Sequence, residues 1–307
     1  MGSTTLKGCG TALVTPFSAD GSAIDEGALR RLLRYQIESG IHFLVPCGTT
    51  GESPTLSHEE TLRVVEITVS EARPARVPVY AGAGGNNTAK IIELAREYVH
   101  LGVDGILSVS PYYNKPTQEG LYQHYRAIAS GVPLPIIVYN VPGRTGSNVE
   151  PATIARLAEI DNIVAVKEAS GNITQMAEIA NLVPDGFALL SGDDAITLPL
   201  MALGGVGLIS VASNEVPGEM AKMVNAALRG DFVEARRRHR KLLPLMQINF
   251  IESSPGPVKA ALAMLGMIEE SYRLPLVPIR AESKAKLRDV LEKTGVYESC
   301  RTYRVAV

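Results

Sequence analysis

Short runs rich in valine, isoleucine and leucine alternate with longer segments of helical period along most of this 307-residue chain. A candidate helix follows each of eight runs, at residues 10–15, 43–47, 78–82, 105–110, 135–140, 163–168, 188–192 and 206–211. Repeated strand-then-helix units predict a parallel sheet. Eight units match a closed (β/α)₈ barrel, or TIM barrel, better than an open doubly wound sheet of about five or six strands. The sequence therefore predicts an α/β fold of the barrel type.

The starts of several helices can be recognised in the sequence. Ser57 and Glu60 have the spacing of a capping box, in which each side chain accepts a hydrogen bond from the backbone N–H of the other residue. Asp25 is suited to cap the helix that follows the first run. These starts agree with the count of strand-then-helix units.

The chain changes character after Gly230. Strand-like runs stop there, and three helical segments follow, separated by breaks that contain proline and glycine, at residues 231–245, 257–265 and 281–294. The sequence therefore predicts two domains. We expect a barrel over residues 1–230 and an all-helical C-terminal appendage over residues 231–307.

Charge and composition indicate a small-molecule partner. Charged residues make up 20% of the chain and the formal net charge is -2, so neither nucleic acid nor an anionic membrane is an expected partner. No apolar run approaches the roughly 18 residues of a membrane span, and no signal core follows Met1. We expect a soluble protein of the cytoplasm.

The cysteines and the glycine-rich segments indicate no metal and no cofactor. Cys9, Cys47 and Cys300 lack CxxC spacing, so neither a disulfide framework nor a zinc site is expected. The segment at residues 82–87 lacks the third glycine of a dinucleotide-binding fingerprint, and the Walker phosphate-binding pattern does not occur. Neither NAD nor ATP is therefore implied.

The run at residues 163–168 ends in a lysine, which is unusual for a buried strand. Ile163, Ala165 and Lys167 share one face by the two-residue period, so burial of both faces would hold the amine in apolar surroundings. Burial disfavours the ammonium form and lowers the pKa, and a neutral amine can attack a carbonyl to form a Schiff base. The alternative is a lysine that extends past the strand end into solvent.

In a (β/α)₈ barrel the active site lies at the carboxyl ends of the strands, so the residues after each run are candidates. After the second run, Gly48 and Gly51 let backbone N–H groups converge, and the hydroxyls of Thr49 and Thr50 add donors suited to a carboxylate. An ordinary turn has the same composition.

Tyrosines follow the fourth and fifth runs. Tyr112 and Tyr113 stand on a loop bounded by prolines, where one ring can pack while the other reaches the site. Tyr139 ends the fifth run and Arg144 follows it: a phenol beside an amine can transfer protons, and a guanidinium can bind a carboxylate in bidentate fashion. In the eighth run, Ile209 is suited to wall a small apolar substituent, although a core isoleucine gives the same pattern.

Three motifs together resemble those of one family. They are Gly48-Thr-Thr-Gly-Glu-Ser53, Tyr139-Asn-Val-Pro-Gly-Arg-Thr145 and Lys167-Glu-Ala-Ser-Gly171. They are similar to the motifs of the dihydrodipicolinate synthase family, within the pyruvate-dependent class I aldolases that include N-acetylneuraminate lyase, and the resemblance covers essentially the full length. It implies a lyase that condenses pyruvate with L-aspartate 4-semialdehyde to give 4-hydroxy-tetrahydrodipicolinate, in lysine and diaminopimelate biosynthesis.

The resemblance also implies catalytic roles. Lys167 is expected to form the Schiff base with pyruvate, and Tyr139, Thr49 and Tyr113 are expected to form a proton relay. Tyr113 is expected to enter the active site of a neighbouring subunit. The resemblance thus implies a homo-oligomer, expected to be a tetramer built as a dimer of dimers.

The substrate-binding residues implied by the resemblance come from four different strand ends. Thr50 is expected to help hold the pyruvate carboxylate, and Arg144 is expected to bind the carboxylate of the semialdehyde. Gly192 and Ile209 are expected to line the pyruvate site. No cofactor is needed, because the iminium itself acts as the electron sink.

Two other functions are compatible with the sequence. Another pyruvate aldolase, of the 4-hydroxy-2-oxoglutarate, 2-keto-3-deoxygluconate or N-acetylneuraminate type, would share Lys167 and Tyr139, although Arg144 fits a short carboxylated aldehyde better than a polyhydroxylated sugar acid. A non-catalytic barrel that senses an oxo acid would be expected to have lost the lysine or a relay hydroxyl. This chain has lost neither.

Many members of the resembled family are inhibited by lysine, which binds in a cleft between subunits. Four residues of this chain match the pattern of lysine-sensitive members: Ser53, His58, Asn86 and Tyr112. Two differ, because Lys90 stands where those members carry a glutamate and Thr61 stands where they carry a second histidine. We therefore expect weak or absent inhibition by lysine.

Overall fold

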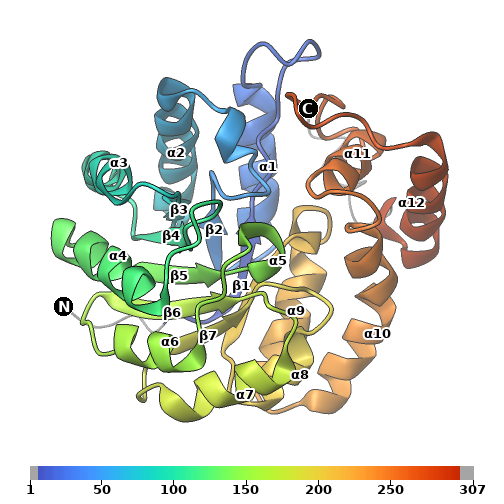
Figure 1. Ribbon diagram of the computed structural model, residues 1–307. Helices are drawn as coiled ribbons and strands as arrows, with labels where there is room; N and C mark the ends of the chain where they lie inside the picture. Colours follow the sequence, from blue (N-terminus) through green and yellow to red (C-terminus); the bar gives the residue numbers. More distant parts are fainter. Residues whose placement is uncertain (1–5, 298–307) are drawn as a thin grey trace.

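The computed structural model describes residues 6–297 and arranges this part of the chain around one eight-stranded parallel sheet (Figure 1). The strands are β1 (Gly8–Ala12), β2 (Phe43–Val45), β3 (Tyr80–Gly82), β4 (Gly105–Val109), β5 (Ile136–Asn140), β6 (Ile163–Glu168), β7 (Ala188–Ser191) and β8 (Gly207–Ser210). Their order in the sheet is β2-β1-β8-β7-β6-β5-β4-β3. Strands that are consecutive in the chain are therefore neighbours, and β1 lies beside β8.

Hydrogen bonds between β2 and β3 bring the two ends of this sheet together. The backbone N–H of Leu44 donates to the carbonyl of Pro78 at 2.9 Å, and that of Gly82 donates to the carbonyl of Pro46 at 2.9 Å. Leu44 also pairs with Val79 in a parallel bridge. The sheet therefore forms a (β/α)₈ barrel, and the predicted fold class is confirmed.

Strand β1 differs most from its predicted bounds. It begins at Gly8, and Gly8 and Cys9 pair with Gly207 and Leu208 of β8. The sequence pattern missed this start because glycine has a low strand propensity. Glycine is nonetheless required at residue 207, since a Cβ there would lie 2.0 Å from the carbonyl oxygen of Gly8.

Helices connect the strands and surround the barrel (Figure 1). They are α1 (Glu26–Glu38), α2 (His58–Ala72), α3 (Thr88–Leu101), α4 (Gln118–Gly131), α5 (Pro142–Thr145), α6 (Pro151–Leu157), α7 (Ile173–Leu182), α8 (Thr197–Ala202) and α9 (Pro217–Leu228), with 3₁₀ helices η1 (Ser53–Thr55), η2 (Arg73–Ala75) and η3 (Ala212–Asn214). The predicted starts are confirmed. Asp25 caps α1 by accepting from the N–H of Ala28, and Ser57 and Glu60 form a complete capping box at α2.

The described part of the chain ends in three further helices, α10 (Phe232–Ile248), α11 (Gly256–Met264) and α12 (Ala281–Thr294). They lie together on one side of the barrel, with α10 against α9 and α12 against α10 and α11 (Figure 1). Helix α10 continues past its predicted end at Leu245, because Leu245 and Met246 are both still buried in the core. The domain boundary at residue 230 stays a prediction.

The side chains of β6 alternate between the inside and the outside of the barrel. Ala165 belongs to the cluster inside the barrel, and Lys167 two residues later has the same direction. The shared face expected for Ile163 is wrong, because Ile163 packs in the cluster between the barrel and its helices. The cause is a pairing irregularity, in which Ile136 lies opposite Ile163 but Ile137 lies opposite Ala165.

Candidate active site

Two candidate residues lie side by side at the carboxyl ends of β5 and β6. The register of these strands places Tyr139 directly opposite Lys167. The Lys167 Nζ atom lies 4.1 Å from the centre of the Tyr139 ring, and the two residues are only 6% and 7% exposed. The lysine is therefore held inside the barrel and does not extend into solvent.

Burial changes the chemistry of the Lys167 amine. It lowers the pKa to about 7, with a smaller lowering from the charge of Arg144, while the carboxylate of Asp194 acts in the opposite direction. An ordinary lysine has a pKa of about 10.4 and is almost entirely charged at pH 7. At a pKa of about 7, roughly half of the amine is neutral at that pH. A partly neutral amine of this kind can act as a nucleophile near neutral pH.

A second buried lysine provides a contrast. The Lys259 Nζ atom lies 2.5 Å from the Glu52 carboxylate, and both side chains are fully buried. Burial lowers the pKa of Lys259 as well, while the charge and the hydrogen bond of Glu52 act to raise it. The Lys259 amine is thus engaged by a carboxylate, whereas the Lys167 amine faces an aromatic ring.

Tyr139 connects the lysine to the loop after β2. Burial raises the pKa of the Tyr139 phenol, while the charge of Arg144 and a side-chain hydrogen bond with Thr49 act to lower it. The phenol therefore has a hydroxyl partner on one side and the Lys167 amine against its ring. Tyr139 is thus in contact with both Lys167 and Thr49, and the relay implied by the resemblance stays a prediction.

Gly192 and Ile209 are both close to this centre. A Cβ at Gly192 would lie 3.0 Å from Cε and 3.2 Å from Cγ of Lys167, so a side chain there would displace the lysine. Ile209 is 1% exposed and belongs to the cluster inside the barrel that also contains Tyr139. Packing in the barrel core accounts for this isoleucine, and its predicted role as a wall of the pyruvate site stays a prediction.

A cavity of about 380 Å³ opens at this end of the barrel. Thr49, Tyr139 and Arg144 are among the residues that line it. Arg144 is exposed, and its guanidinium donates to the carbonyl of Ser254 at 3.4 Å. A molecule in this cavity would therefore meet the threonine hydroxyl, the phenol and the guanidinium together.

The loop between β2 and η1 has a constrained backbone. Cys47 and Glu52 both have left-handed φ angles, of 55° and 54°, which is uncommon for residues other than glycine. The hydroxyl of Thr15 donates to the carbonyl of Gly51 at 2.7 Å and fixes the middle of the loop. Thr50 is buried in this loop, and it is absent from the lining of the 380 Å³ cavity.

The two adjacent tyrosines after β4 have different surroundings. Tyr112 lines the cavity, whereas Tyr113 is 89% exposed and has a φ angle of 69°. Tyr113 is not among the residues that line this cavity. The chain alone does not bring Tyr113 to the lysine, and its entry into a neighbouring subunit stays a prediction.

Sequence reasoning missed the polar network behind the lysine. Glu168 is fully buried and accepts hydrogen bonds from Asn140 at 2.9 Å, from the backbone N–H of Ser170 at 2.7 Å and from Gln175 at 3.4 Å. Asn140 is paired with Glu168 one position after the Tyr139 and Lys167 pair. The two-residue period could have indicated this outward-facing pair.

Asp194 was also missed. Its buried carboxylate accepts from the hydroxyl of Ser210 at 2.5 Å and from the backbone N–H groups of Val211 and Ala212 at 3.1 Å each. Burial raises the pKa of Asp194, while these three hydrogen bonds lower it. The available signal was its position, two residues after Gly192 at a strand end.

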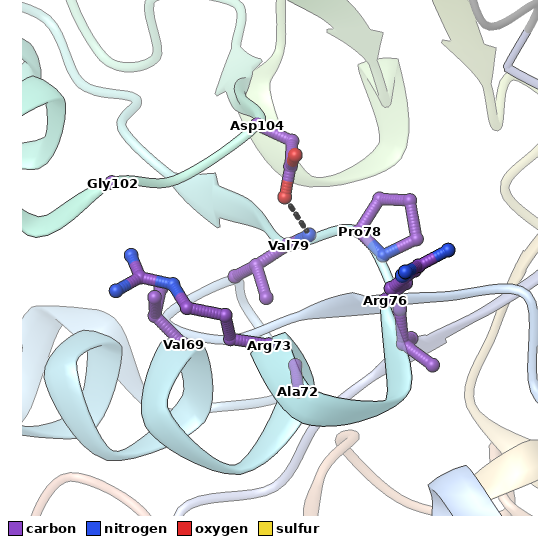
Figure 2. Close-up of a pocket in the computed structure, with 9 residues that line it drawn as sticks. Val69, Ala72, Arg73, Arg76, Pro78, Val79, Gly102 and Asp104 are labelled. Carbon is purple, nitrogen blue, oxygen red and sulfur yellow. Dashed lines mark hydrogen bonds between the residues drawn. The ribbon is translucent and has the colours of Figure 1, made fainter.

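Figure 2 shows a second hollow, of about 200 Å³, between the end of α2 and the start of β3. Asp104 borders it and accepts a hydrogen bond from the backbone N–H of Val79 at 2.9 Å. Arg73 and Arg76 also line it, and both are exposed. This hollow is at the amino ends of the strands, opposite to the end where barrel enzymes carry out their chemistry.

The remaining predictions concern metal ions, cysteines and membrane-spanning helices. Within residues 6–297, no cluster of three or more histidine, cysteine or acidic residues is arranged to hold a metal ion. Cys9 and Cys47 are buried free thiols, and burial raises the pKa of Cys47 to about 12, while Cys300 lies outside the described residues. None of the described helices combines the length and apolar character needed to cross a membrane.

Comparisons with known proteins agree on one family. The model of the dihydrodipicolinate synthetase family matches residues 5–294. The chain is 58% identical to the 4-hydroxy-tetrahydrodipicolinate synthase of Koribacter versatilis, over 96% of this chain and 98% of that protein. It is similar to the structure of dihydrodipicolinate synthase from Aquifex aeolicus, with a TM-score of 0.92, 45% identity and coverage of 95% and 99% of the two chains.

A third similar structure contains pyruvate. The structure of the dihydrodipicolinate synthase from Acinetobacter baumannii complexed with pyruvate has a TM-score of 0.93 and 42% identity, with coverage of 95% of this chain and 100% of that one. The fold, the strand-end residues and the full-length matches lead to the same conclusion. This chain belongs to the dihydrodipicolinate synthetase family.

Proposed function

We propose that this protein condenses pyruvate with L-aspartate 4-semialdehyde to give 4-hydroxy-tetrahydrodipicolinate. The observation that carries the proposal is the buried Lys167 amine, stacked on the Tyr139 ring at the carboxyl end of the barrel. An amine that is partly neutral near pH 7 can form a Schiff base with a keto acid. Membership of the family specifies the condensation that follows, which belongs to lysine and diaminopimelate biosynthesis.

The reaction begins when the Lys167 amine attacks the keto carbon of pyruvate. Loss of water gives an imine, and its protonated form withdraws electrons from the methyl group, so that a methyl proton can be removed near neutral pH. The resulting enamine carbon bonds to the aldehyde carbon of the second substrate. The amino group of this adduct then displaces Lys167 as the ring closes, which restores the free amine.

Tyr139 is the residue best placed to transfer protons during these steps. Its ring lies against the amine that becomes the imine nitrogen, and its hydroxyl is hydrogen-bonded to Thr49. A positioned acid and base of this kind contributes about 10²- to 10⁴-fold to a rate. Tyr113 from a neighbouring subunit completes the relay in this proposal.

The two carboxylates of the substrates require separate binding groups. Thr50 and the backbone of its loop hold the carboxylate of pyruvate, close to Gly192 and Ile209. Arg144 lines the cavity and binds the carboxylate of the semialdehyde. A guanidinium suits this role because it binds a carboxylate in bidentate fashion.

Arg144 also separates this proposal from the other pyruvate aldolases. It lines the same cavity as Tyr139 and Thr49, so a short aldehyde bound there can place its own carboxylate on the guanidinium. A coupled assay with pyruvate and each aldehyde in turn tests this choice. Turnover with a sugar-derived aldehyde and none with aspartate semialdehyde would contradict it.

The proposal also covers the oligomeric state and the cellular location of the protein. The exposure of Tyr113 on a loop beside the cavity supports its insertion into a neighbouring subunit, within a homotetramer built as a dimer of dimers. The metabolic role and the buried free thiols support a cytoplasmic location.

We expect borohydride to trap a covalent adduct of pyruvate on Lys167, because reduction converts the imine to a stable amine. Peptide mass spectrometry locates the adduct. The initial rate of trapping should fall by about tenfold per pH unit well below a pKa of about 7, because the ammonium form is not a nucleophile.

The Lys167→Arg substitution is the matched control, since a guanidinium stays protonated and cannot form the imine. It should abolish trapping. An adduct on Lys115 or Lys259 would contradict the assignment of the nucleophile.

We expect Arg144→Ala to impair use of the semialdehyde far more than use of pyruvate. A hydrogen bond to a charged group contributes about 1.5–3 kcal/mol, so kcat/KM for the semialdehyde should fall by about ten- to a hundredfold. Steady-state kinetics with each substrate varied in turn measure this difference. Arg156→Ala removes an arginine that is paired with Glu119 on the surface and serves as the control. Unchanged semialdehyde kinetics would favour another aldolase.

We expect mixed subunits to recover activity if Tyr113 acts in a neighbouring site. The Tyr113→Phe subunit keeps its lysine and the Lys167→Ala subunit keeps its tyrosine, so one site of each mixed dimer is complete. An equal mixture should show about a quarter of the wild-type activity, since about half of the dimers are mixed. Mixed dimers without activity, formed from parents that fold, would show that Tyr113 acts within its own chain.

We expect L-lysine to inhibit this enzyme weakly or not at all. Lys90 is exposed at the start of α3, and a cation there repels an amino group of the inhibitor where a glutamate would bind it. Losing one charge-assisted bond lowers the affinity by at least about tenfold. Activity titrated against L-lysine measures this affinity, and Lys90→Glu should increase it. Inhibition of the unaltered protein below about 1 mM would contradict the charge argument.

A further inference from the structure

Glu52 is bound to the loop residue Thr49 through the backbone. The backbone N–H of Glu52 donates to the carbonyl of Thr49 at 3.1 Å, and Glu52 has a left-handed backbone, with φ 54° and ψ 35°. This conformation costs free energy for a residue with a side chain, so the surroundings must maintain it. Any displacement of Glu52 would be transmitted to Thr49 through this hydrogen bond.

The C-terminal helices supply the group that fixes Glu52. Lys259 of α11 donates to Glu52 Oε1 at 2.5 Å, and both side chains are fully buried. The second carboxylate oxygen of Glu52 accepts from the backbone N–H of Arg273 at 3.4 Å. The Lys259 ammonium also lies 4.2 Å from the centre of the Phe17 ring. Residues that are more than two hundred positions apart in the chain thus meet in one buried ion pair.

Arg273 holds the far end of the same loop. Its guanidinium donates to the carbonyl of Thr55 at 3.0 Å and to both carboxylate oxygens of Glu60 at 2.6 Å each. It also lies 4.3 Å from the centre of the Phe17 ring. The segment from Glu52 to Glu60 is therefore bound by the C-terminal part of the chain at both ends.

A buried ion pair adds little to the stability of a folded protein. The desolvation of two charges offsets most of their attraction, and apolar residues of similar volume often stabilise a protein as well or better. An ion pair does fix one geometry, because its atoms must meet at a single distance and direction. The burial of this pair at a residue whose backbone is hydrogen-bonded to Thr49 is thus better explained by positioning than by stability.

We propose that Glu52 and Lys259 are positioning residues, which place the Thr49 hydroxyl for proton transfer with Tyr139 and make the C-terminal helices part of the catalytic apparatus. This inference rests on the proposed function. Neither residue touches the substrates. The C-terminal helices act on the site by holding a loop of the barrel.

The test compares four proteins: the wild type, Glu52→Gln, the double variant Glu52→Gln with Lys259→Met, and Lys284→Met. The single variant leaves the Lys259 charge buried without its partner and can fail to fold, whereas the double variant removes both charges and keeps the volume. Lys284→Met removes a partly buried lysine of α12 that pairs with Glu270 at 2.7 Å. It is the matched control, because the side-chain hydrogen bonds of that pair join Lys284, Glu270 and Tyr272 and not the loop from Glu52 to Glu60.

Three quantities are measured well below each thermal midpoint: kcat, the exchange of the pyruvate methyl protons with deuterium followed by NMR, and the extent of borohydride trapping on Lys167 at saturating pyruvate. In the double variant we expect kcat and the exchange rate to fall by at least about tenfold, because small displacements of catalytic groups cost up to about a hundredfold. Trapping should stay within about twofold, since β6 holds Lys167 independently of the loop. The control should match the wild type.

Two outcomes would overturn the inference. If the folded double variant keeps kcat and exchange within about twofold of the wild type, the pair is structural only. If trapping is lost together with turnover, the pair supports the whole site and not the threonine relay. Failure of the proposed function gives a different result, because the wild type itself would then form no adduct with pyruvate.

Discussion

The pairing of β5 with β6 is the constraint on which the site depends. It places Tyr139 opposite Lys167 inside the barrel and Asn140 opposite Glu168 outside it. A slip of one residue would reverse the direction of all four side chains, so the outer pair fixes the inner one. The hydrogen bond of 2.9 Å between Asn140 and Glu168 thus helps to set the positions of Tyr139 and Lys167.

The barrel interior determines what each buried lysine can do. Lys167 faces an aromatic ring, within residues 6–297 it forms no ion pair, and burial lowers its pKa to about 7. Lys259 is also buried but has Glu52 within hydrogen-bond distance. The two buried lysines thus differ in their partners, although burial lowers the pKa of both. The distant Asp194 charge limits how far the pKa of Lys167 falls.

The C-terminal part of the chain connects to the site through several contacts with barrel loops. Ser254, between α10 and α11, accepts from the Arg144 guanidinium, and Lys259 and Arg273 bind the loop that carries Thr49. A part of the chain that looks like an appendage in the sequence therefore contacts both the residue proposed for the second substrate and the loop of the proposed relay. A barrel enzyme commonly takes its catalytic groups from strand ends, and here the C-terminal part of the chain contacts Arg144 and the loop of Thr49 from outside the barrel.

The sequence alone determined the barrel, the helix caps and the strand ends that carry Lys167, Tyr139, Thr49 and Arg144, because these follow from periodicity and from local motifs. It did not determine the packing of Ile163, whose expected face depends on a pairing irregularity with β5. Nor did it indicate the buried pair of Glu52 and Lys259, because residues so far apart in the chain meet only after the helices dock. Local patterns encode the helices and strands and their directions. The low dielectric that lowers the pKa of Lys167 exists only once the chain has folded, and so does the ion pair between Glu52 and Lys259.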